Sequence, residues 1–348
     1  MITPQKIKLA RKMRGLSMDQ LTQRMGAAAV SKMSISKIER GLLKPSERTL
    51  QAIARACQVP VTYFSTPTVA IGRMEFRFDR TTTPRQREQI MASVTAAVEA
   101  HVILHSYAMD APAFVNPLAG MEVSNYPDMD EAAIRLRRAW EIGRQPIFSV
   151  YELLQDHGIH IIEADIDDEH VDGASTYVNG TLPVVVINSR HCTTTERKRL
   201  TALHELGHLL LTIHPLTASA YADYRRTLTP FEQQTTVKCP DVERLCHHFA
   251  GSMLLPDASL RRRIGSHRTH VGTEELISLR NTYGISIAGA VHQLHDLSLI
   301  NDACYNHLYD TVINPNRMEE GLGSFPIPET ADADALLKIR LEWELNDI

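Results

Sequence analysis

The sequence predicts a multidomain protein in which an all-α domain is followed by an α+β domain. The chain has 348 residues, whereas single domains usually have roughly 100 to 200. Short amphipathic helical patterns fill residues 4–64, while β-branched runs typical of strands occur only later, at 159–162 and 183–188. The segments that we predict are an all-α N-terminal domain at 1–66, a connector with a helix at 67–128, an α+β domain at 129–300 and a C-terminal extension at 301–348.

Composition is that of an ordinary globular protein. Hydrophobic residues make up 43% of the chain and charged residues 22%, both near average values. No apolar run is long enough to cross a bilayer, and the first residues enter a charged amphipathic pattern without the apolar core of a signal peptide. The five cysteines are odd in number and form no CxxC pair, so a disulfide framework is not indicated. These features predict a cytoplasmic protein with no membrane partner.

Charge is divided unevenly along the chain. Residues 1–64 hold 12 Lys and Arg residues against three acidic ones, a net charge of +9. Because the whole chain carries −4, the remainder carries −13. A basic segment of this kind favours contact with a polyanion such as nucleic acid.

Glycines and serines divide the N-terminal segment into four or five predicted helices. Gly15 and Gly26 are placed to end the first two, and Ser17 and Ser31 to cap the second and third.

The third helix would bury Ile35 and Ile38 and expose Lys32, Met33, Ser34, Ser36 and Lys37. A short helix that is basic at its outer N-terminal end and follows a tight turn can enter the major groove of DNA.

The string from Val30 to Gly41, followed by Lys44-Pro45-Ser46, resembles the lambda-repressor-like (XRE) helix-turn-helix family, over about residues 4–64. The resemblance implies a double-stranded DNA operator as partner. It also implies contacts to bases from Lys32, Met33 and Lys37 and to phosphates from Ser31 and Arg40.

Two features depart from this family's pattern. The turn has three extra residues, 27–29, and Met18 stands where the family often has a glutamine. A small helical bundle that binds protein is the alternative interpretation of the segment.

A five-residue motif, His204-Glu205-Leu206-Gly207-His208, lies in a helix predicted to begin with a capping box at 193–196 and to run until Pro215. Residues four apart project from one face of a helix, so His204 and His208 can share a metal ion. The carboxylate of Glu205 can take a proton from an attacking water and deliver it to a leaving amine. Zn²⁺ suits this chemistry, because it accepts nitrogen and oxygen ligands and lowers the pKa of bound water to about 7.

A third ligand is expected on the helix predicted at 241–255. We favour Glu243, because one carboxylate and two histidines leave an open coordination position for catalysis. His247, four residues later on the same face, remains the competing ligand, whereas His248 is expected to point away.

The stretch from Arg197 to Leu210, together with Glu243, Phe249-Ala250 and Leu254-Leu255-Pro256, resembles the ImmA/IrrE metallopeptidase family over about residues 130–300. The resemblance implies a zincin-like α+β fold with a helical C-terminal part. It further implies His204, His208 and Glu243 as zinc ligands and Glu205 as general base. The implied function is a regulatory zinc endopeptidase that cleaves a repressor or antitoxin-like protein in a stress or mobile-element response.

Two other hypotheses remain open for the function. In one, the metallopeptidase-like domain of a transcription factor senses a ligand or partner without cutting, although the intact Glu205 favours a protease. In the other, the chain cleaves itself within the connector between Ser65 and Asp128.

Several side chains and segments have alternative interpretations. The run 184–188 is either an edge strand that binds extended substrate or a plain core strand. Tyr283, His292 and His295 are unranked candidates for donors to the transition state. Near the C-terminus, the i+4 spacing of Leu337, Leu341 and Leu345 predicts an amphipathic helix that packs internally or against a second copy in a homodimer.

Overall fold

The structure is a computed structural model that describes residues 2–74, 76, 78, 81–105, 112–234, 239–316 and 322–331. The chain forms two compact units. The first is Met1–Asp110 with Ile162–Asp172 and Thr176–His191, and the second is Ala111–Ile161 with Gly173–Ser175 and Cys192–Ile348. The predicted multidomain α+β class is confirmed, while the predicted helix with Leu337, Leu341 and Leu345 lies outside the described residues. Within the described part of the chain, no helix has the length and apolar character needed to span a membrane.

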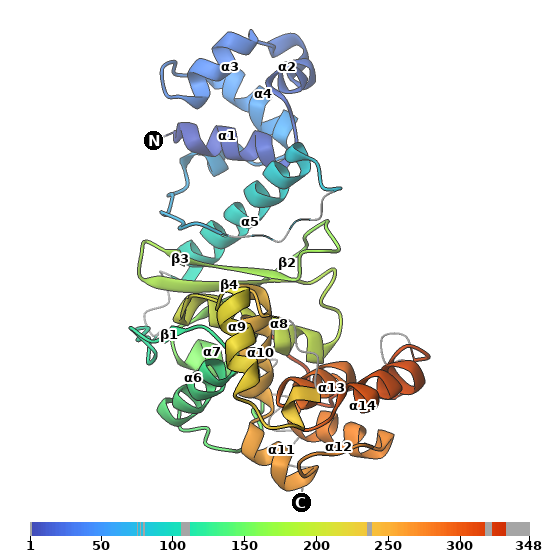
Figure 1. Cartoon of the computed structure of the whole chain (residues 1–348). Helices are drawn as coiled ribbons and strands as arrows, with labels where there is room; N and C mark the ends of the chain where they lie inside the picture. Colours follow the sequence, from blue (N-terminus) through green and yellow to red (C-terminus); the bar gives the residue numbers. More distant parts are fainter. Residues whose placement is uncertain are drawn as a thin grey trace, which may run out of the picture. The chain divides into compact units, whose positions relative to one another are not determined.

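Four helices form the N-terminal bundle of the first unit (Figure 1). They are α1 (Pro4–Met13), α2 (Met18–Met25), α3 (Lys32–Glu39) and α4 (Glu47–Cys57), with 3₁₀ turns η1 (Gly26–Ala28) and η2 (Val61–Ser65). Ser17, Ser31 and Ser46 cap α2, α3 and α4, each accepting a hydrogen bond from the backbone N–H three residues later. The predicted helices therefore form, with their apolar faces turned to one core.

The extra residues between α2 and α3 form the short turn η1. Gly26 ends α2 with a φ of 60°, a left-handed conformation that glycine adopts without strain. Ala28 and Val30 then pack against the core of the bundle. The insertion thus lengthens the turn before α3, with Ala28 packed against the core and Ala27 and Ala29 exposed.

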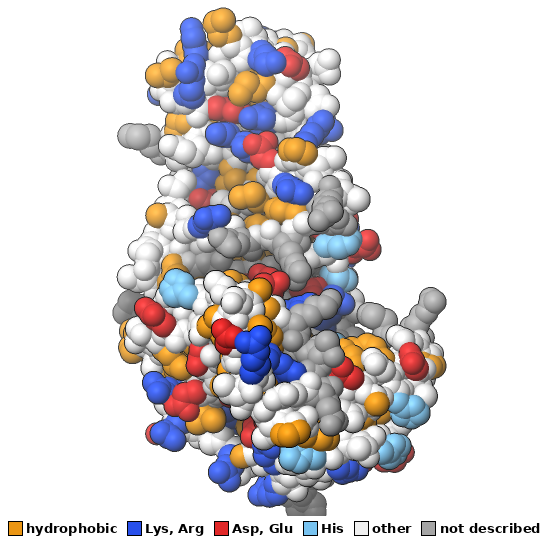
Figure 2. Space-filling view, viewed as in Figure 1, with side chains coloured by type: hydrophobic (Ala, Val, Ile, Leu, Met, Phe, Trp, Pro, Cys, Tyr) orange, Lys and Arg blue, Asp and Glu red, His pale blue; other side chains and the backbone are white. Residues whose placement is uncertain are grey.

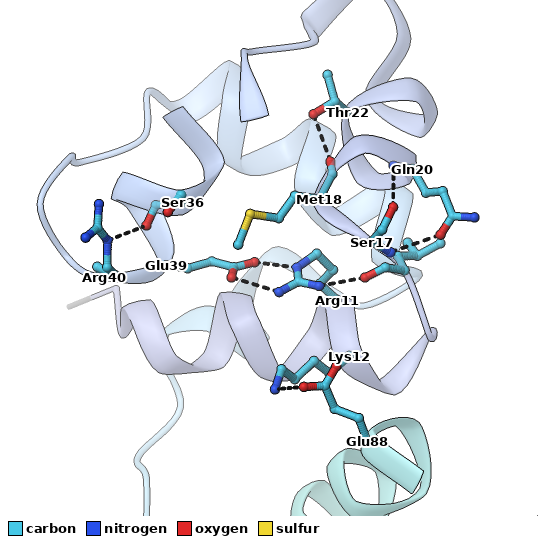
Figure 3. Close-up of polar contacts among 11 residues, drawn as sticks. Arg11, Lys12, Ser17, Met18, Gln20, Thr22, Ser36, Glu39, Arg40 and Glu88 are labelled. Atoms are coloured by element: carbon cyan, nitrogen blue, oxygen red, sulfur yellow. Dashed lines mark hydrogen bonds and ion pairs between the residues drawn. The ribbon is translucent and has the colours of Figure 1, made fainter. Parts of the chain in front are cut away.

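A buried ion pair joins α1 to α3. Arg11 donates from Nε to Glu39 Oε1 at 2.6 Å and from Nη2 to Oε2 at 2.9 Å, and it also donates to the carbonyl of Leu16. Figure 3 shows the two side chains facing each other, with Met18 beside them. A paired, bidentate geometry offsets the cost of burying both charges. The orientation of α3 in the bundle therefore depends on Glu39 at its end.

The helix predicted within the connector is α5 (Pro84–His105), and it belongs to the first unit. Lys6 of α1 donates to Glu99 of α5 at 2.7 Å, and Lys12 pairs with Glu88. The valines of α5 pack against Val178, Val184 and Val186 of the sheet. Helix α5 of the predicted connector is therefore packed on both α1 and the sheet within the first unit.

The sheet has three strands, β2 (His160–Ala164), β3 (Gly173–Val178) and β4 (Leu182–Asn188), in the order β2-β4-β3. Asn179 and Gly180 join β3 to β4 with φ values of 53° and 77°, as in the two-residue turns that favour Asn-Gly. Because β4 is the central strand, the structure supports the interpretation of 184–188 as a plain core strand and excludes the alternative of an edge strand. Strand β3 is an outer strand of this sheet, and Ile71 pairs with Val178 on its outer side near the C-terminal end.

Helices make up most of the second unit. Its elements are β1 (Glu122–Val123), α6 (Tyr126–Ala139), α7 (Val150–Asp156), α8 (Thr195–Leu210), β5 (Thr212–Ile213), α9 (Ala218–Arg226), η3 (Glu232–Gln234), α10 (Val242–Leu254), α11 (Asp257–Arg263), α12 (Thr273–Tyr283), α13 (Ile287–Asp296), α14 (Asp302–Leu308) and the π-helix η4 (Tyr309–Ile313). The helix predicted to reach Pro215 ends earlier, because the chain leaves α8 to pair in parallel with β1.

Helix α10 packs directly on α8 through Gly207. A Cβ atom at this position would lie 3.3 Å from both Cys246 Sγ and Phe249 Cδ1 of α10, which is close to the limit of van der Waals contact. Burial raises the pKa of the Cys246 thiol, so this side chain acts as a neutral packing group. The absence of a side chain at Gly207 thus permits the close approach of the two helices.

The first turns of α8 are anchored by residues far away in the sequence. Arg199 is fully buried and donates to Glu329 Oε1 at 2.6 Å and to the carbonyls of Ile147, Phe148 and Gly284. Glu329 in turn accepts from the Ser149 hydroxyl and from the first backbone N–H groups of α7.

Glu196 binds the C-terminal segment too. Its carboxylate accepts from the backbone N–H of Phe325, while Thr194 caps α8 by accepting from the N–H of Arg197. The predicted capping box therefore does not form. Together with Glu329, this contact makes residues 322–331 of the predicted extension part of the packing around α8.

We predict that Glu329→Gln lowers the free energy of unfolding by about 3 to 5 kcal/mol, because it leaves the buried Arg199 without a charged partner. Denaturant unfolding followed by fluorescence of the buried Trp140 measures this loss. Glu131→Gln is the matched control, since Glu131 pairs with Arg135 on the exposed face of α6 and should cost less than about 1 kcal/mol. Equal losses in the two variants would contradict the anchoring role.

Candidate functional site

The two motif histidines and Glu243 converge between α8 and α10 in the second unit. Nε2 of His204 and Nε2 of His208 lie 3.2 Å apart. The Glu243 carboxylate reaches them both, with Oε2 3.2 Å from His204 Nε2 and Oε1 3.6 Å from His208 Nε2. One ligand atom from each residue lies within 4.8 Å of the others. The structure thus brings together all three predicted ligands.

These separations fit a tetrahedral metal ion. Zinc bonds to nitrogen and oxygen are about 2.0 to 2.2 Å long, which places neighbouring ligand atoms roughly 3.3 to 3.5 Å apart. The two imidazole nitrogens lie 3.2 Å apart, and each has a different oxygen of the Glu243 carboxylate nearby, at 3.2 Å from His204 and 3.6 Å from His208, so the separations are near these values. His204 is buried, whereas His208 and Glu243 are partly exposed, so the cluster is open on one side. A donor set of two imidazoles and one carboxylate with an open side is typical of catalytic zinc sites.

Glu205 lies next to this cluster and is oriented by β3. Its side chain is nearly buried, at 8% exposure, and Oε2 accepts a hydrogen bond of 2.8 Å from the Ser175 hydroxyl. Sequence analysis missed Ser175, since nothing in the local pattern connects this strand residue with α8. The hydrogen bond holds the carboxylate in one orientation, as a proton-transferring group requires.

The Nδ1 atom of His204, on the other side of the ring from Nε2, is buried. Within the described part of the chain this atom has no hydrogen-bond partner. A ligating histidine usually donates its other ring N–H to a carboxylate, carbonyl or water. The chain thus orients His204 by packing, through its burial between α8 and α10, more than by a hydrogen bond at this nitrogen.

His247 lies beside the cluster but outside the group of converging ligand atoms. Its ring packs against that of His204, with 4.2 Å between the centroids and 48° between the planes. The ring is exposed to solvent on its other side. Glu243 and His247 therefore share a helix face, as predicted, but only the carboxylate is grouped with both motif histidines.

His248 points away from the cluster, as predicted, and holds α10 in place from behind. It is fully buried, with Nε2 2.9 Å from Asp130 Oδ1 of α6 and Nδ1 3.7 Å from Asp296 Oδ2 of α13, and its ring stacks on Tyr126. Burial alone would lower its pKa, but the two carboxylates raise the pKa of His248 to about 10. The imidazole is thus cationic at neutral pH and links α10 to two neighbouring helices.

Three candidate transition-state donors now have different surroundings. Tyr283 is buried, and its carbonyl accepts from Arg199. His295 is buried against Asp302, at 2.8 Å. His292 is exposed and contacts the hydroxyls of Tyr305 and Tyr309. Of the three, His292 alone is both exposed and part of the cavity wall that also contains His247.

The predicted DNA-contacting residues lie on the exposed side of α3 and at its ends. Lys32, Lys37 and Arg40 are exposed, and the Met33 side chain is 67% exposed although it is apolar. Ser31 is used as the N-cap, accepting from the Ser34 N–H at 3.1 Å.

The basic groups on this surface are held only loosely. Lys32 forms an exposed ion pair with Asp19 of α2 at 2.8 Å. Figure 2 shows Lys and Arg side chains on the surface of the α1–α4 bundle.

Met18, in the position where the family often has a glutamine, is half-buried against the bundle core and the Arg11–Glu39 pair (Figure 3). The thioether of Met18 therefore cannot form the polar contact to the DNA backbone that a glutamine in this position can form.

Comparison with known protein families gives two matches. The helix-turn-helix family matches residues 7–64, and the IrrE N-terminal-like domain of a peptidase family matches residues 154–295. No curated protein gives a significant match to the chain. The first match covers α1–α4, and the second covers the motif helix α8, α10 and α13. The chain is therefore a fusion of an XRE-type helix-turn-helix domain with an IrrE N-terminal-like domain of the peptidase class.

Proposed function

We propose that this chain is a transcriptional regulator that binds a DNA operator through α3 and cleaves a partner protein at a zinc centre held by His204, His208 and Glu243. The observation that carries the proposal is the convergence of these three side chains beside the oriented carboxylate of Glu205. The family matches support the coarser function of a DNA-binding regulator with a peptidase-like domain.

The proposed reaction is hydrolysis of a peptide bond. Bound Zn²⁺ would supply Lewis acidity, which polarises the scissile carbonyl and makes water acidic enough to react at neutral pH. Glu205 accepts the proton of the attacking water and delivers it to the leaving amine. Ser175 keeps the Glu205 carboxylate oriented during both transfers, through the hydrogen bond to Oε2.

An edge strand beside the metal centre favours an extended peptide as substrate. Strand β3 is at the edge of the sheet and carries Ser175, which contacts Glu205. Extended peptides commonly add to sheet edges by backbone hydrogen bonds. We therefore assign substrate binding to β3, and not to the run 184–188, for which it was one of two alternative interpretations.

A repressor or antitoxin-like protein is the proposed substrate, and a stress or mobile-element response the proposed setting. The DNA-binding domain in the same chain supports this assignment, because it would concentrate the peptidase near proteins that occupy operators. A pure sensor of ligands would need neither Glu205 nor its hydrogen bond to Ser175. Cleavage of the chain itself is tested by the same experiment as cleavage of a partner.

We predict that Glu205→Gln retains near-stoichiometric zinc but loses cleavage, because Glu205 transfers protons and does not bind the metal. Metal content is measured after purification without added zinc. Cleavage of candidate repressors, and of the chain itself, is followed by gel electrophoresis with and without chelator. Glu131→Gln, on the exposed face of α6, is the matched control and should retain both zinc and activity. Loss of zinc from Glu205→Gln would make Glu205 a ligand and overturn its assigned role, and a parent protein that cleaves nothing would favour the sensor.

The third ligand is tested by comparing Glu243→Ala with His247→Ala. We expect Glu243→Ala to reduce zinc affinity far more than the roughly 10- to 100-fold that is typical of losing a residue behind the ligands, since only two protein ligands would remain. His247→Ala should stay within that smaller range. Competition with a zinc-binding dye places both variants on one scale. A greater loss in His247→Ala would replace the carboxylate by a third histidine.

The DNA interface is tested with Lys37→Ala. We expect this change to weaken binding to an operator selected in vitro by about 1 to 3 kcal/mol, because a lysine facing the groove contributes a base contact as well as charge. Lys8→Ala removes the same charge from an exposed position on α1 and should have a smaller effect. Titrations by gel shift at one salt concentration measure both. Equal affinities of the parent and Lys37→Ala would refute the assignment of α3.

A further inference from the structure

A cavity of about 530 Å³ lies beside the proposed metal centre in the second unit. Leu200 of α8 and His247 of α10 both line it. Leu200 lies four residues before His204, and His247 four residues after Glu243, so each is one helical turn from a proposed ligand. The packing of the His247 ring on that of His204 makes this wall continuous with the metal cluster. The cavity and the proposed metal centre are therefore direct neighbours.

Apart from Arg244 and His247, which are exposed, the polar side chains deeper in the cavity wall are engaged with protein groups. The pairs are His248 with Asp130 and Asp296, Gln293 with Ser252, His295 with Asp302, and His292 with Tyr305 and Tyr309. Because these atoms are directed at one another, an occupant meets mainly ring faces and aliphatic carbon. The rings come from four helices and include those of Tyr126 and Tyr305. Burying a charged group among engaged partners would cost its hydration without a compensating contact.

Small residues keep the cavity open on the α13 side. Ala288 and Gly289, in the first turn of α13, contribute little more than backbone to the wall. The resulting volume falls in the range of roughly 300 to 1,000 Å³ that is common for ligand pockets. His247 and Arg244 are exposed and mark the mouth. The cavity thus has the size and the access that a large side chain of a substrate requires.

We infer that this cavity binds an aromatic side chain adjacent to the scissile bond and thereby determines the cleavage-site preference. The inference rests on the proposed peptidase function and adds the substrate class that it selects. Aromatic rings gain more than buried area in such a wall, because edge-to-face and offset contacts with the tyrosine and histidine rings are favourable. The neighbouring metal centre positions the peptide bond, and the cavity positions the residue beside it.

The test uses the full-length zinc-loaded protein and three chelating probes. Acetohydroxamate reports on the metal alone, 3-phenylpropionohydroxamate adds a phenyl ring, and succinic monohydroxamate adds a carboxylate. Calorimetric titration measures the dissociation constant of each. We expect the phenyl probe to bind at least about tenfold more tightly than acetohydroxamate, from burial of the ring. The carboxylate probe should gain less than the phenyl probe, because Arg244 and His247 at the mouth would meet its charge in solvent, where such pairs contribute little.

Two matched variants localise the effect. Ala288→Leu places a larger side chain in the wall and should reduce the advantage of the phenyl probe to about twofold or less, with acetohydroxamate affinity unchanged. Ala303→Leu makes the same substitution at an exposed position of α14 outside the wall and should keep the full advantage.

Two results would overturn the inference alone: normal binding of acetohydroxamate without a phenyl advantage, or an undiminished advantage in Ala288→Leu. Failure of the zinc-loaded parent to bind acetohydroxamate would instead contradict the proposed open coordination position, and the inference would fall with it. The comparison of probes on the parent needs no variant, so it remains decisive if Ala288→Leu does not fold.

Discussion

The close packing of α10 on α8 is the constraint on which the metal cluster depends. Gly207 lies between the two motif histidines and faces Cys246 and Phe249, where even a methyl group would be tightly packed. This approach brings Glu243 within 3.6 Å of both imidazoles. A larger side chain at Gly207 would separate the helices and thus the ligand atoms. The motif therefore contains two of the proposed ligands and also the glycine that lets the third approach them.

Buried ion pairs fix the positions of the surrounding helices relative to one another. Arg199 reaches Glu329 across 130 positions of the sequence, and His248 reaches Asp130 across 118. In the N-terminal bundle, Arg11 and Glu39 play the same part for α3. Breaking a buried pair is strongly destabilising, since an unpaired charge remains in a poorly polarisable interior. Each of these pairs thus limits how far the helix that carries functional residues can shift.

The residues that we propose to contact DNA are held in a different way. Lys32 pairs with Asp19 in full solvent, an interaction worth about 0 to 1 kcal/mol, so its exchange for a DNA contact costs little. The backbone of α3 is nonetheless fixed by the Ser31 cap and by the Arg11–Glu39 pair. A rigid helix that presents mobile basic side chains suits binding to DNA, where phosphate contacts position the protein and base contacts specify the sequence.

Local spacing in the sequence determined the helices of the N-terminal bundle, their serine caps and the histidine pair on α8, because each follows from residues within four positions of one another. The Asn179-Gly180 turn was a local signal as well, and it could have revealed β3. Only the tertiary structure decided which residue of α10 meets the histidines, because Glu243 and His247 share one face and the packing angle of the helix separates them. The tertiary structure also decided the central position of β4, the hydrogen bond from Ser175 to Glu205 and the role of Glu329. The contacts of Ser175 and Glu329 join segments 30 or more residues apart, and no periodic pattern encodes such a pairing.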